Sequence, residues 1–203
     1  MALTLFGVVE DDVHAVHAVA LGTELIAVRD LTAVCAPCAQ RVTEPDDAAA
    51  MRHNDVVMNF SARGPILPAP VGVAFRNREA VGRWLELHYS ALSDALSFVQ
   101  NRVAARVHVT RAVAGEERET SADLVAIASE SMRELRASAV ATVALRPDQK
   151  PGIVQSAAFL VDAKAWKAFA TAVEERGRQS TSVRFELTGP WPPYDFVQMQ
   201  LGT

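Results

Sequence analysis

Cysteine is scarce in this chain, and long apolar runs are missing. Among the 203 residues there are two cysteines, Cys35 and Cys38, too few for the disulfide framework of a secreted domain. The longest apolar stretches, such as Val13–Leu21, are interrupted by histidines and are too short to cross a bilayer. The opening residues, MALTLFGVVEDD, lack the basic segment and cleavage pattern of a secretion signal. We therefore expect a cytoplasmic protein that has no membrane partner.

A surplus of charge is missing as well. The formal net charge is −4, and the 20 lysines and arginines do not gather in a stripe. A phosphate backbone needs such a surface, so nucleic acid is not an expected partner. The chain also lacks a P-loop and a G-x-G-x-x-G motif, so no nucleotide site is indicated and we expect no cofactor. With 50% apolar and 22% charged residues, the composition is that of a folded globular protein.

The first hundred residues predict an irregular α+β domain. Strands are expected at three short apolar segments: Leu3–Val9, Glu24–Arg29 and Leu31–Cys35. A helix capped by Thr43 should then carry one apolar face, made of Ala49, His53, Val56, Val57 and Phe60. The prolines of Gly64–Pro70 should prevent regular structure, before a strand at Val71–Phe75. One long amphipathic helix is expected from Asn77 to about Gln100, where we place the domain boundary.

Residues 101–188 predict a second domain, with the element order β-α-β-β-α-β of a ferredoxin-like fold. In its first strand, Arg102–Thr110, apolar and polar side chains alternate. The later elements are expected in this order: helix Ser121–Arg136, strands Ser138–Leu145 and Ile153–Val161, a helix capped by Asp162 and ended by Gly177, and strand Ser182–Thr188. Such an order forms an antiparallel sheet with both helices on one face. The predicted fold class is therefore α+β, with domains at 1–100 and 101–188 and a tail at 189–203.

The motif Cys35-Ala-Pro-Cys38 raises the alternative of a dithiol oxidoreductase, or of a small-molecule binder on a ferredoxin-like scaffold. A C-x-x-C motif at a strand-to-helix turn can lower the pKa of a thiol, which makes it reactive. The chain has no tryptophan before Cys35 and no long helix beginning there. The other interpretation is two small apolar side chains at a strand end.

Histidines and carboxylates give little support to catalysis. His14 and His17 could join the two cysteines in a zinc site, although the spacing is not that of a known finger. His53 and His88 lie on apolar helix faces and are expected to be core or interface histidines. The carboxylates are scattered rather than paired as an acid and a base. We therefore expect no catalytic residues, no bound metal and no enzyme activity.

The segment Leu187–Val197, LTGPWPPYDFV, combines prolines with large aromatic side chains. Gly189 and three prolines should prevent regular structure, yet the aromatic side chains are too apolar to remain in water. The segment therefore either packs back onto its own domain or is an exposed anchor for a partner. The candidate docking residues are Trp191, Pro192, Pro193, Tyr194 and Phe196.

Within this segment, Thr188–Val197 closely resembles the C-terminal motif of the gas-vesicle accessory proteins of the F/L family, GvpF and GvpL. Other segments resemble the family in the same order: Leu3–Val9, Arg52–Val57, Ile66–Phe75 and Ala157–Asp162. The chain departs from the family at Pro70–Val73, where the family usually has Arg-Phe-Gly-Thr.

The resemblance implies an accessory protein that helps to build gas vesicles, the gas-filled protein shells that give some prokaryotic cells buoyancy. The implied partners are the small hydrophobic shell subunit and other accessory proteins, and the implied role is a chaperone-like assembly factor in the cytoplasm and at the gas vesicle. It also implies two α+β domains, the second of them ferredoxin-like, which agrees with the element order predicted above.

Overall fold

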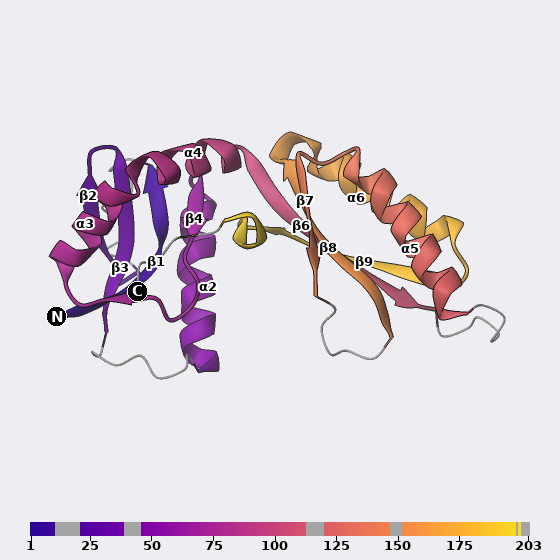
Figure 1. Cartoon of the computed structure of the whole chain (residues 1–203), viewed down its shortest axis with the longest axis horizontal. Coiled ribbons are helices and arrows are strands. Elements are labelled where there is room, and N and C mark those ends of the chain that lie inside the picture. The colour runs from indigo at the N-terminus through magenta and orange to yellow at the C-terminus, as the bar shows by residue number, and fades with distance from the viewer. Residues whose placement is uncertain (11–20, 39–45, 113–119, 147–151, 198, 200–203) are drawn as a thin grey trace. The chain divides into compact units, whose positions relative to one another are not determined.

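The computed structural model describes residues 1–10, 21–38, 46–112, 120–146, 152–197 and 199. The chain divides into two compact units, an N-terminal unit of Met1–Asn101 with Pro192–Thr203 and a C-terminal unit of Arg102–Trp191. Each unit combines helices with one antiparallel sheet (Figure 1), so the predicted α+β class is confirmed. None of the helices in the described ranges is long and apolar enough to span a membrane.

The N-terminal unit is built on a five-stranded sheet. Its strands are β1 (Ala2–Glu10), β2 (Glu24–Val28), β3 (Leu31–Cys38), β4 (Ile66–Pro68) and β5 (Ala74–Phe75). The strand order is β2-β3-β1-β4, and β5 pairs with β1 as well. Its helical elements are α2 (Asp47–Ser61), α3 (Arg78–Leu87), α4 (Tyr89–Val99) and the 3₁₀ turn η2 (Tyr194–Phe196).

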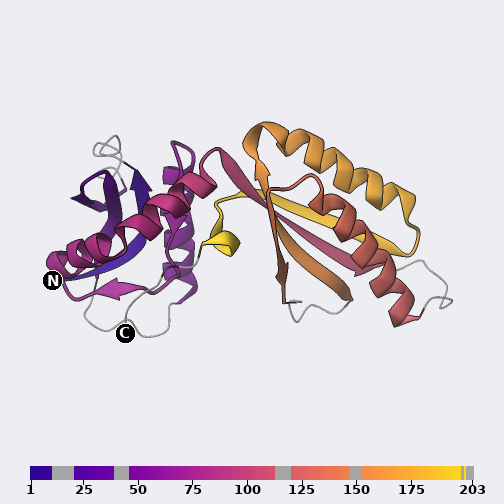
Figure 2. The same ribbon diagram turned by 45° about the horizontal axis from the view of Figure 1, so that its top comes forward.

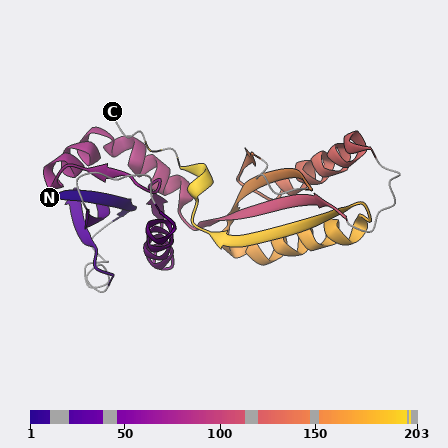
Figure 3. The same cartoon turned by 90° about the horizontal axis from the view of Figure 1, so that it is seen from below.

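Helices cover both faces of this sheet (Figure 3). On one face, side chains such as Leu5 pack with Leu85 and Leu96 of α3 and α4. On the other face, Phe6 and its neighbours pack with Phe60 of α2. Because both faces are buried, β1 and β3 are apolar along nearly their whole length, as a strand buried on two sides requires.

The C-terminal unit has the element order β-α-β-β-α-β, so the predicted order is confirmed. Its elements are β6 (Arg102–Arg111), α5 (Ser121–Arg136), β7 (Ala141–Leu145), β8 (Ile153–Asp162), the turn η1 (Ala163–Ala165), α6 (Trp166–Gln179) and β9 (Val183–Trp191). The strands lie in the order β7-β8-β6-β9, and every pairing is antiparallel. Helices α5 and α6 lie on one face of this sheet (Figure 2), around a core that includes Phe159 and Phe169.

Two predictions of irregular structure at prolines are wrong, because strands at the edge of a sheet tolerate proline. Ile66–Pro68 forms β4 although it lies in the proline-interrupted segment. Strand β9 continues through Gly189 and Pro190 to Trp191, so the tail does not begin at Gly189. Both strands are at sheet edges, where an N–H group on the outer side has no ladder partner to lose.

Three helix details also differ from expectation. The predicted long helix is divided at His88, whose backbone leaves helical geometry (φ −103°, ψ 13°). Gly177 lies inside α6 rather than past its end, and Asp162 makes no side-chain capping bond. Thr43 lies outside the described residues, and α2 is capped by Asp46, whose carboxylate accepts from the Ala49 N–H at 2.8 Å.

Candidate functional site

The proline- and aromatic-rich segment has two parts: its first residues form the end of β9, and the residues from Pro192 onward pack on the N-terminal unit. Trp191 is the last residue of β9 and pairs with Ala104 of β6. Its indole N–H donates to the Thr188 hydroxyl at 3.1 Å, and 37% of the residue remains exposed. Trp191 therefore keeps a large aromatic surface available while its polar atom is satisfied.

Residues 192–197 and 199 belong to the N-terminal unit, and several of them pack against its core. Pro192 and Pro193 are buried. Tyr194 packs against the core cluster on the α2 face, with its ring 6.4 Å from the ring of His53. Val197 and Met199 pack against the cluster on the α3 and α4 face. The described residues of this stretch therefore pack on the N-terminal unit, not on the domain that precedes them in the sequence.

Phe196, the last of the predicted docking residues, is half-buried in η2. Its backbone N–H donates to the Pro193 carbonyl at 3.0 Å. A hydrogen bond from the Tyr194 N–H to the Pro192 carbonyl, at 2.8 Å, precedes it. The prolines and these two bonds hold η2 as a turn and so restrict the positions of its aromatic residues.

Gly189 is the residue of the motif whose identity the structure explains most directly. Its φ is +130°, a conformation that residues with a side chain rarely adopt. A Cβ at this position would lie 2.8 Å from the Ala104 carbonyl oxygen and 2.9 Å from the Trp166 ring. The Thr-Gly-Pro-Trp sequence thus needs glycine so that Trp166 can lie against the β9 backbone.

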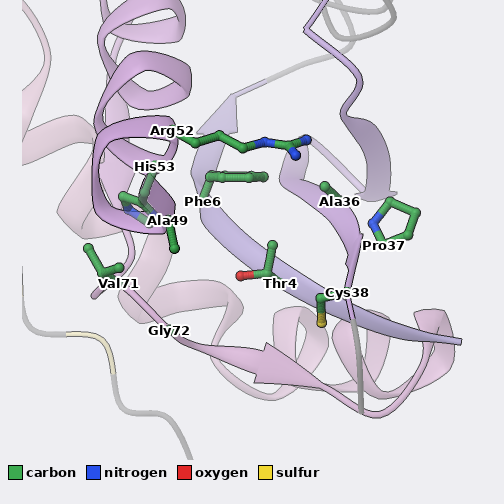
Figure 4. Close-up of a pocket in the computed structure, with 10 residues that line it drawn as sticks. All are labelled: Thr4, Phe6, Ala36, Pro37, Cys38, Ala49, Arg52, His53, Val71 and Gly72. Carbon is green, nitrogen blue, oxygen red and sulfur yellow. The ribbon is translucent and has the colours of Figure 1, made fainter. Parts of the chain in front are cut away.

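A cavity of about 220 Å³ lies between α2 and the sheet of the N-terminal unit (Figure 4). Three elements and one loop supply its lining: Thr4 and Phe6 from β1; Ala36, Pro37 and Cys38 from β3; Ala49, Arg52 and His53 from α2; Val71 and Gly72 after β4. The volume is below that of most small-molecule sites and suits one large side chain or a very small ligand.

His53 is a core histidine, as predicted, and only one of its two ring nitrogens has a hydrogen-bond partner among the described residues. The residue is 3% exposed, and its ring packs against Phe6 with centroids 5.4 Å apart. One ring nitrogen bonds the Ala69 backbone. Because the Ala69 N–H already donates to the Phe6 carbonyl, the ring donates to the Ala69 carbonyl.

The second ring nitrogen, Nε2, is buried and has no hydrogen-bond partner in the described part of the chain. Burial lowers the pKa of His53, and the bond with Ala69 opposes that change. The neutral ring therefore presents an unfilled acceptor, which costs free energy in a buried position.

Among the described residues that line the cavity, Arg52 supplies the one cationic side chain. Figure 4 shows its side chain extending past Phe6 toward Ala36. The described lining residues include no carboxylate, and the Thr4 hydroxyl already donates to the Val73 carbonyl at 3.1 Å. These residues therefore suit an apolar group with an anionic end, and the described His53 Nε2 is not hydrogen-bonded to a nucleophile.

The dithiol hypothesis is contradicted by the position of the two cysteines in β3. Three residues along a strand span roughly 10 Å, and an odd separation places the side chains on opposite faces. Cys35 packs in the core on the α3 and α4 face, whereas Cys38 lines the cavity on the α2 face. A disulfide needs Cα atoms about 4.4–6.8 Å apart.

The electrostatics of the thiols agree with this geometry. Burial raises the pKa of Cys35 to about 12, and the negative charge of Glu24 adds to the rise. Burial also raises the pKa of Cys38. A redox-active pair needs a lowered thiol pKa, so neither cysteine is activated.

The zinc hypothesis involves residues that the structure does not describe. His14 and His17 lie outside the described residues. Among the residues that are described, no three His, Cys, Asp or Glu side chains are close enough together to hold a metal ion.

The fold defines a two-unit α+β protein whose N-terminal unit has a small cavity and a docked C-terminal stretch. Comparison with known sequences gives the family. The sequence model of the family described as "Gas vesicle synthesis protein GvpL/GvpF" matches residues 3–124 and 114–198. The chain belongs to the GvpL/GvpF family of gas vesicle proteins, and the resemblance found in its sequence is confirmed.

Individual relatives agree with this assignment. The chain is 27% identical to gas vesicle protein F2 of Halobacterium salinarum, over 98% of this chain and 94% of that protein. It is 23% identical to gas vesicle protein F1 of the same organism, over 79% of this chain and 75% of that protein.

Solved structures show the same fold. The crystal structure of GvpF from an Anabaena species has a TM-score of 0.82 at 15% identity, covering 100% of this chain and 98% of that one. The crystal structure of GvpF from Microcystis aeruginosa has a TM-score of 0.77 at 12% identity, covering 98% of this chain and 99% of that one.

Proposed function

We propose that this protein binds the hydrophobic gas-vesicle shell subunit and other accessory proteins while the vesicle is built. The observation that carries the proposal is the match to the gas-vesicle family, which extends from residue 3 to residue 198. The protein would act as a stoichiometric, non-catalytic binding partner in the cytoplasm and at the vesicle.

The physical need for such a partner follows from the shell itself. A shell subunit with a dry, gas-facing side exposes apolar surface or strand edges before assembly, and such surfaces aggregate unless they are covered. A binding protein can cover them without consuming energy, provided that it presents apolar anchors of its own.

Trp191 is the proposed anchor among the residues of the C-terminal motif. Its neighbour Tyr194 packs into the N-terminal unit, whereas Trp191 is 37% exposed. Tryptophan is over-represented among the residues that dominate binding energy at interfaces. Trp191 would therefore contribute to partner binding, and Tyr194 to the position of the motif.

The test is retention of the shell subunit by the tagged protein after co-expression. We expect Trp191→Ala to reduce retention at least about tenfold, the effect of losing an interface anchor. The control is Leu87→Ala, which removes an apolar side chain that is 79% exposed on α3 and should leave retention unchanged. Circular dichroism should show that both variants are folded.

The possible outcomes test the binding role and the assignment of Trp191 separately. If the unmodified protein retains no shell subunit and no accessory protein, the binding role is wrong. If it retains them and Trp191→Ala does so equally well, the role stands and the assignment of Trp191 is wrong. Mass spectrometry of washed vesicles would show whether the protein remains on the finished shell.

A further inference from the structure

Among the described strands, five are paired on one side only, and these differ in how their open sides are protected. They are β2, β4 and the two-residue β5 in the N-terminal unit, and β7 and β9 in the C-terminal unit. An edge strand presents unpaired N–H and C=O groups, which can pair with another chain. Natural edges are usually protected by charges, prolines, irregularities in the pairing or covering groups.

Charge and covering groups protect β2, and proline protects β4. On β2, Arg78 donates to the Leu25 carbonyl at 3.0 Å and lies 3.7 Å from the Glu24 carboxylate. Strand β4 has three residues and ends in Pro68. Neither edge offers a long run of free backbone groups.

Strand β9 is protected by several features together. It carries Arg184 and Glu186 on exposed positions and contains Gly189 and Pro190. Its pairing with β6 is also irregular, with a register shift between Ala104 and Arg106 of β6.

Strand β7 has none of these features. Its sequence, Ala-Thr-Val-Ala-Leu, contains no charge, no proline and no glycine, and its pairing with β8 is regular. Val143 is 37% exposed, and Val140, just before the strand, is 44% exposed. An uncharged, regular and apolar edge of this kind is suited to pairing with another strand.

We propose that β7 pairs with β7 of a second copy of this chain. The two strands would run antiparallel about a two-fold axis at Val143, joining two four-stranded sheets into one of eight strands. This register places Val143 opposite its own copy, Thr142 opposite Ala144, and Ala141 opposite Leu145. The strand is thus complementary to itself.

Charge also favours this occupant. The nearest described charge on the C-terminal side of β7 is Arg146. In the proposed register Arg146 lies opposite Val140, so the two arginines of the dimer do not face each other. Like charges directly opposite would destabilise the pair, and this register avoids them. The apolar surface of Val140 and Val143 is covered at the same time.

Sedimentation equilibrium tests the dimer. Because a five-residue strand pair is smaller than a standard interface, we expect a dissociation constant on the order of 100 μM. Val143→Lys places two like charges at the axis and should raise that constant at least about tenfold. Leu87→Lys is the matched control, because it changes an exposed apolar residue of α3 in the same way and should leave the constant unchanged.

Cysteine cross-linking tests the register, in a Cys38→Ser background. Val143→Cys should form a linked dimer with itself under mild oxidation, because directly opposed Cα atoms lie about 4.5–5.5 Å apart, within the range that a disulfide bridges. Ala141→Cys and Leu145→Cys should each fail to link alone and should link when mixed.

Three results would overturn the proposal. The first is a protein that remains monomeric up to about 1 mM, well above the affinity expected for so small an interface. The second is a Val143→Lys variant, folded by circular dichroism, that dimerises as the unmodified protein does. The third is a dimer in which Ala141→Cys links to itself, since that requires another register. If the protein is monomeric but Val143→Lys loses the shell subunit, the edge serves a different partner and the dimer is rejected.

Discussion

The two units solve the packing of an antiparallel sheet in different ways. In the N-terminal unit, α2 covers one face of the sheet and α3 with α4 covers the other. In the C-terminal unit, the described helices α5 and α6 share one face. A sheet between two helical layers must bury side chains on both sides, so its central strands have little room for change. In the C-terminal unit, apolar and polar positions alternate along β6, whereas Ser156–Val161 of the central strand β8 are all buried.

This difference explains where each candidate site lies. The cavity and the unsatisfied His53 nitrogen are in the N-terminal unit, which has helices on both faces of its sheet. There the sheet is packed on both sides, so it cannot shift toward α2 to fill the cavity without losing contacts with α3 and α4. The unprotected edge strand β7 is in the unit with one helical layer. The cavity and the edge strand proposed for pairing therefore belong to different units.

The largest expected effect is that of Gly7→Ala in the central strand β1. A Cβ on Gly7 would lie 2.6 Å from the Leu67 carbonyl oxygen and 2.9 Å from the Ile66 side chain. Because β1 has strands on both sides and helices over both faces, it cannot move away, and we expect a loss of about 3 kcal/mol in the free energy of unfolding. Urea unfolding followed by circular dichroism measures it.

The matched control for this change is Gly64→Ala, where nothing lies within 4 Å of the new Cβ. Its effect should stay within about 0.5 kcal/mol, as for an open surface position. If the two substitutions lower the free energy of unfolding by the same amount, the contacts with Leu67 and Ile66 of β4 are not what requires glycine at position 7.

A smaller loss, about 2 kcal/mol, is expected for Gly189→Ala in the edge strand β9. Its new Cβ would contact the Ala104 carbonyl and Trp166, and its φ of +130° is unfavourable for alanine. Strand β9 is paired on one side, so it can shift slightly and relieve part of the contact. The same unfolding experiment applies.

Gly152→Ala separates the two causes. Gly152 also has a positive φ, +90°, but has nothing within 4 Å of the Cβ position. It should cost about 1 kcal/mol from backbone conformation alone. A Gly189→Ala loss no greater than this would show that the contacts with Trp166 and Ala104 contribute nothing.

The same contrast explains which elements could be predicted from the sequence. In the C-terminal unit, α5 was predicted with its observed bounds, and β6 was predicted to within one residue. Alternation along β6 and a capping box from Thr120 to Asp123 are local signals, so they are readable without the fold. In the N-terminal unit, β4 was missed because the protection of an edge by proline resembles a loop in the sequence.

The candidate sites were less accessible from the sequence because they are assembled from distant segments. The aromatic residues of the C-terminal motif stood out by composition, but the contact of Tyr194 with the α2 face depends on the whole fold. Likewise, no local motif joins Thr4, Cys38 and Arg52, which meet only around the cavity. The C-x-x-C motif misled because its chemistry depends on a helical turn, and β3 continues as a strand through both cysteines.

The smallest expected effect is a pH dependence from His53, which would link the cavity to the stability of the N-terminal unit. Burial lowers the pKa of this histidine in the folded state, whereas the unfolded chain has a value near 6.5. Between those two values the unfolded chain binds more protons, so the free energy of unfolding should be full above about pH 6.5 and should fall as the pH decreases below it. We expect a loss of up to about 1 kcal/mol between pH 7.5 and 5.5, since each unit of pKa difference corresponds to about 1.4 kcal/mol. Urea unfolding across this range should show a flatter profile for His53→Gln, which cannot titrate, than for the unmodified protein. Equal profiles would mean that folded His53 takes up a proton as easily as the unfolded chain does. Burial of its ring between α2 and the sheet would then not lower its pKa.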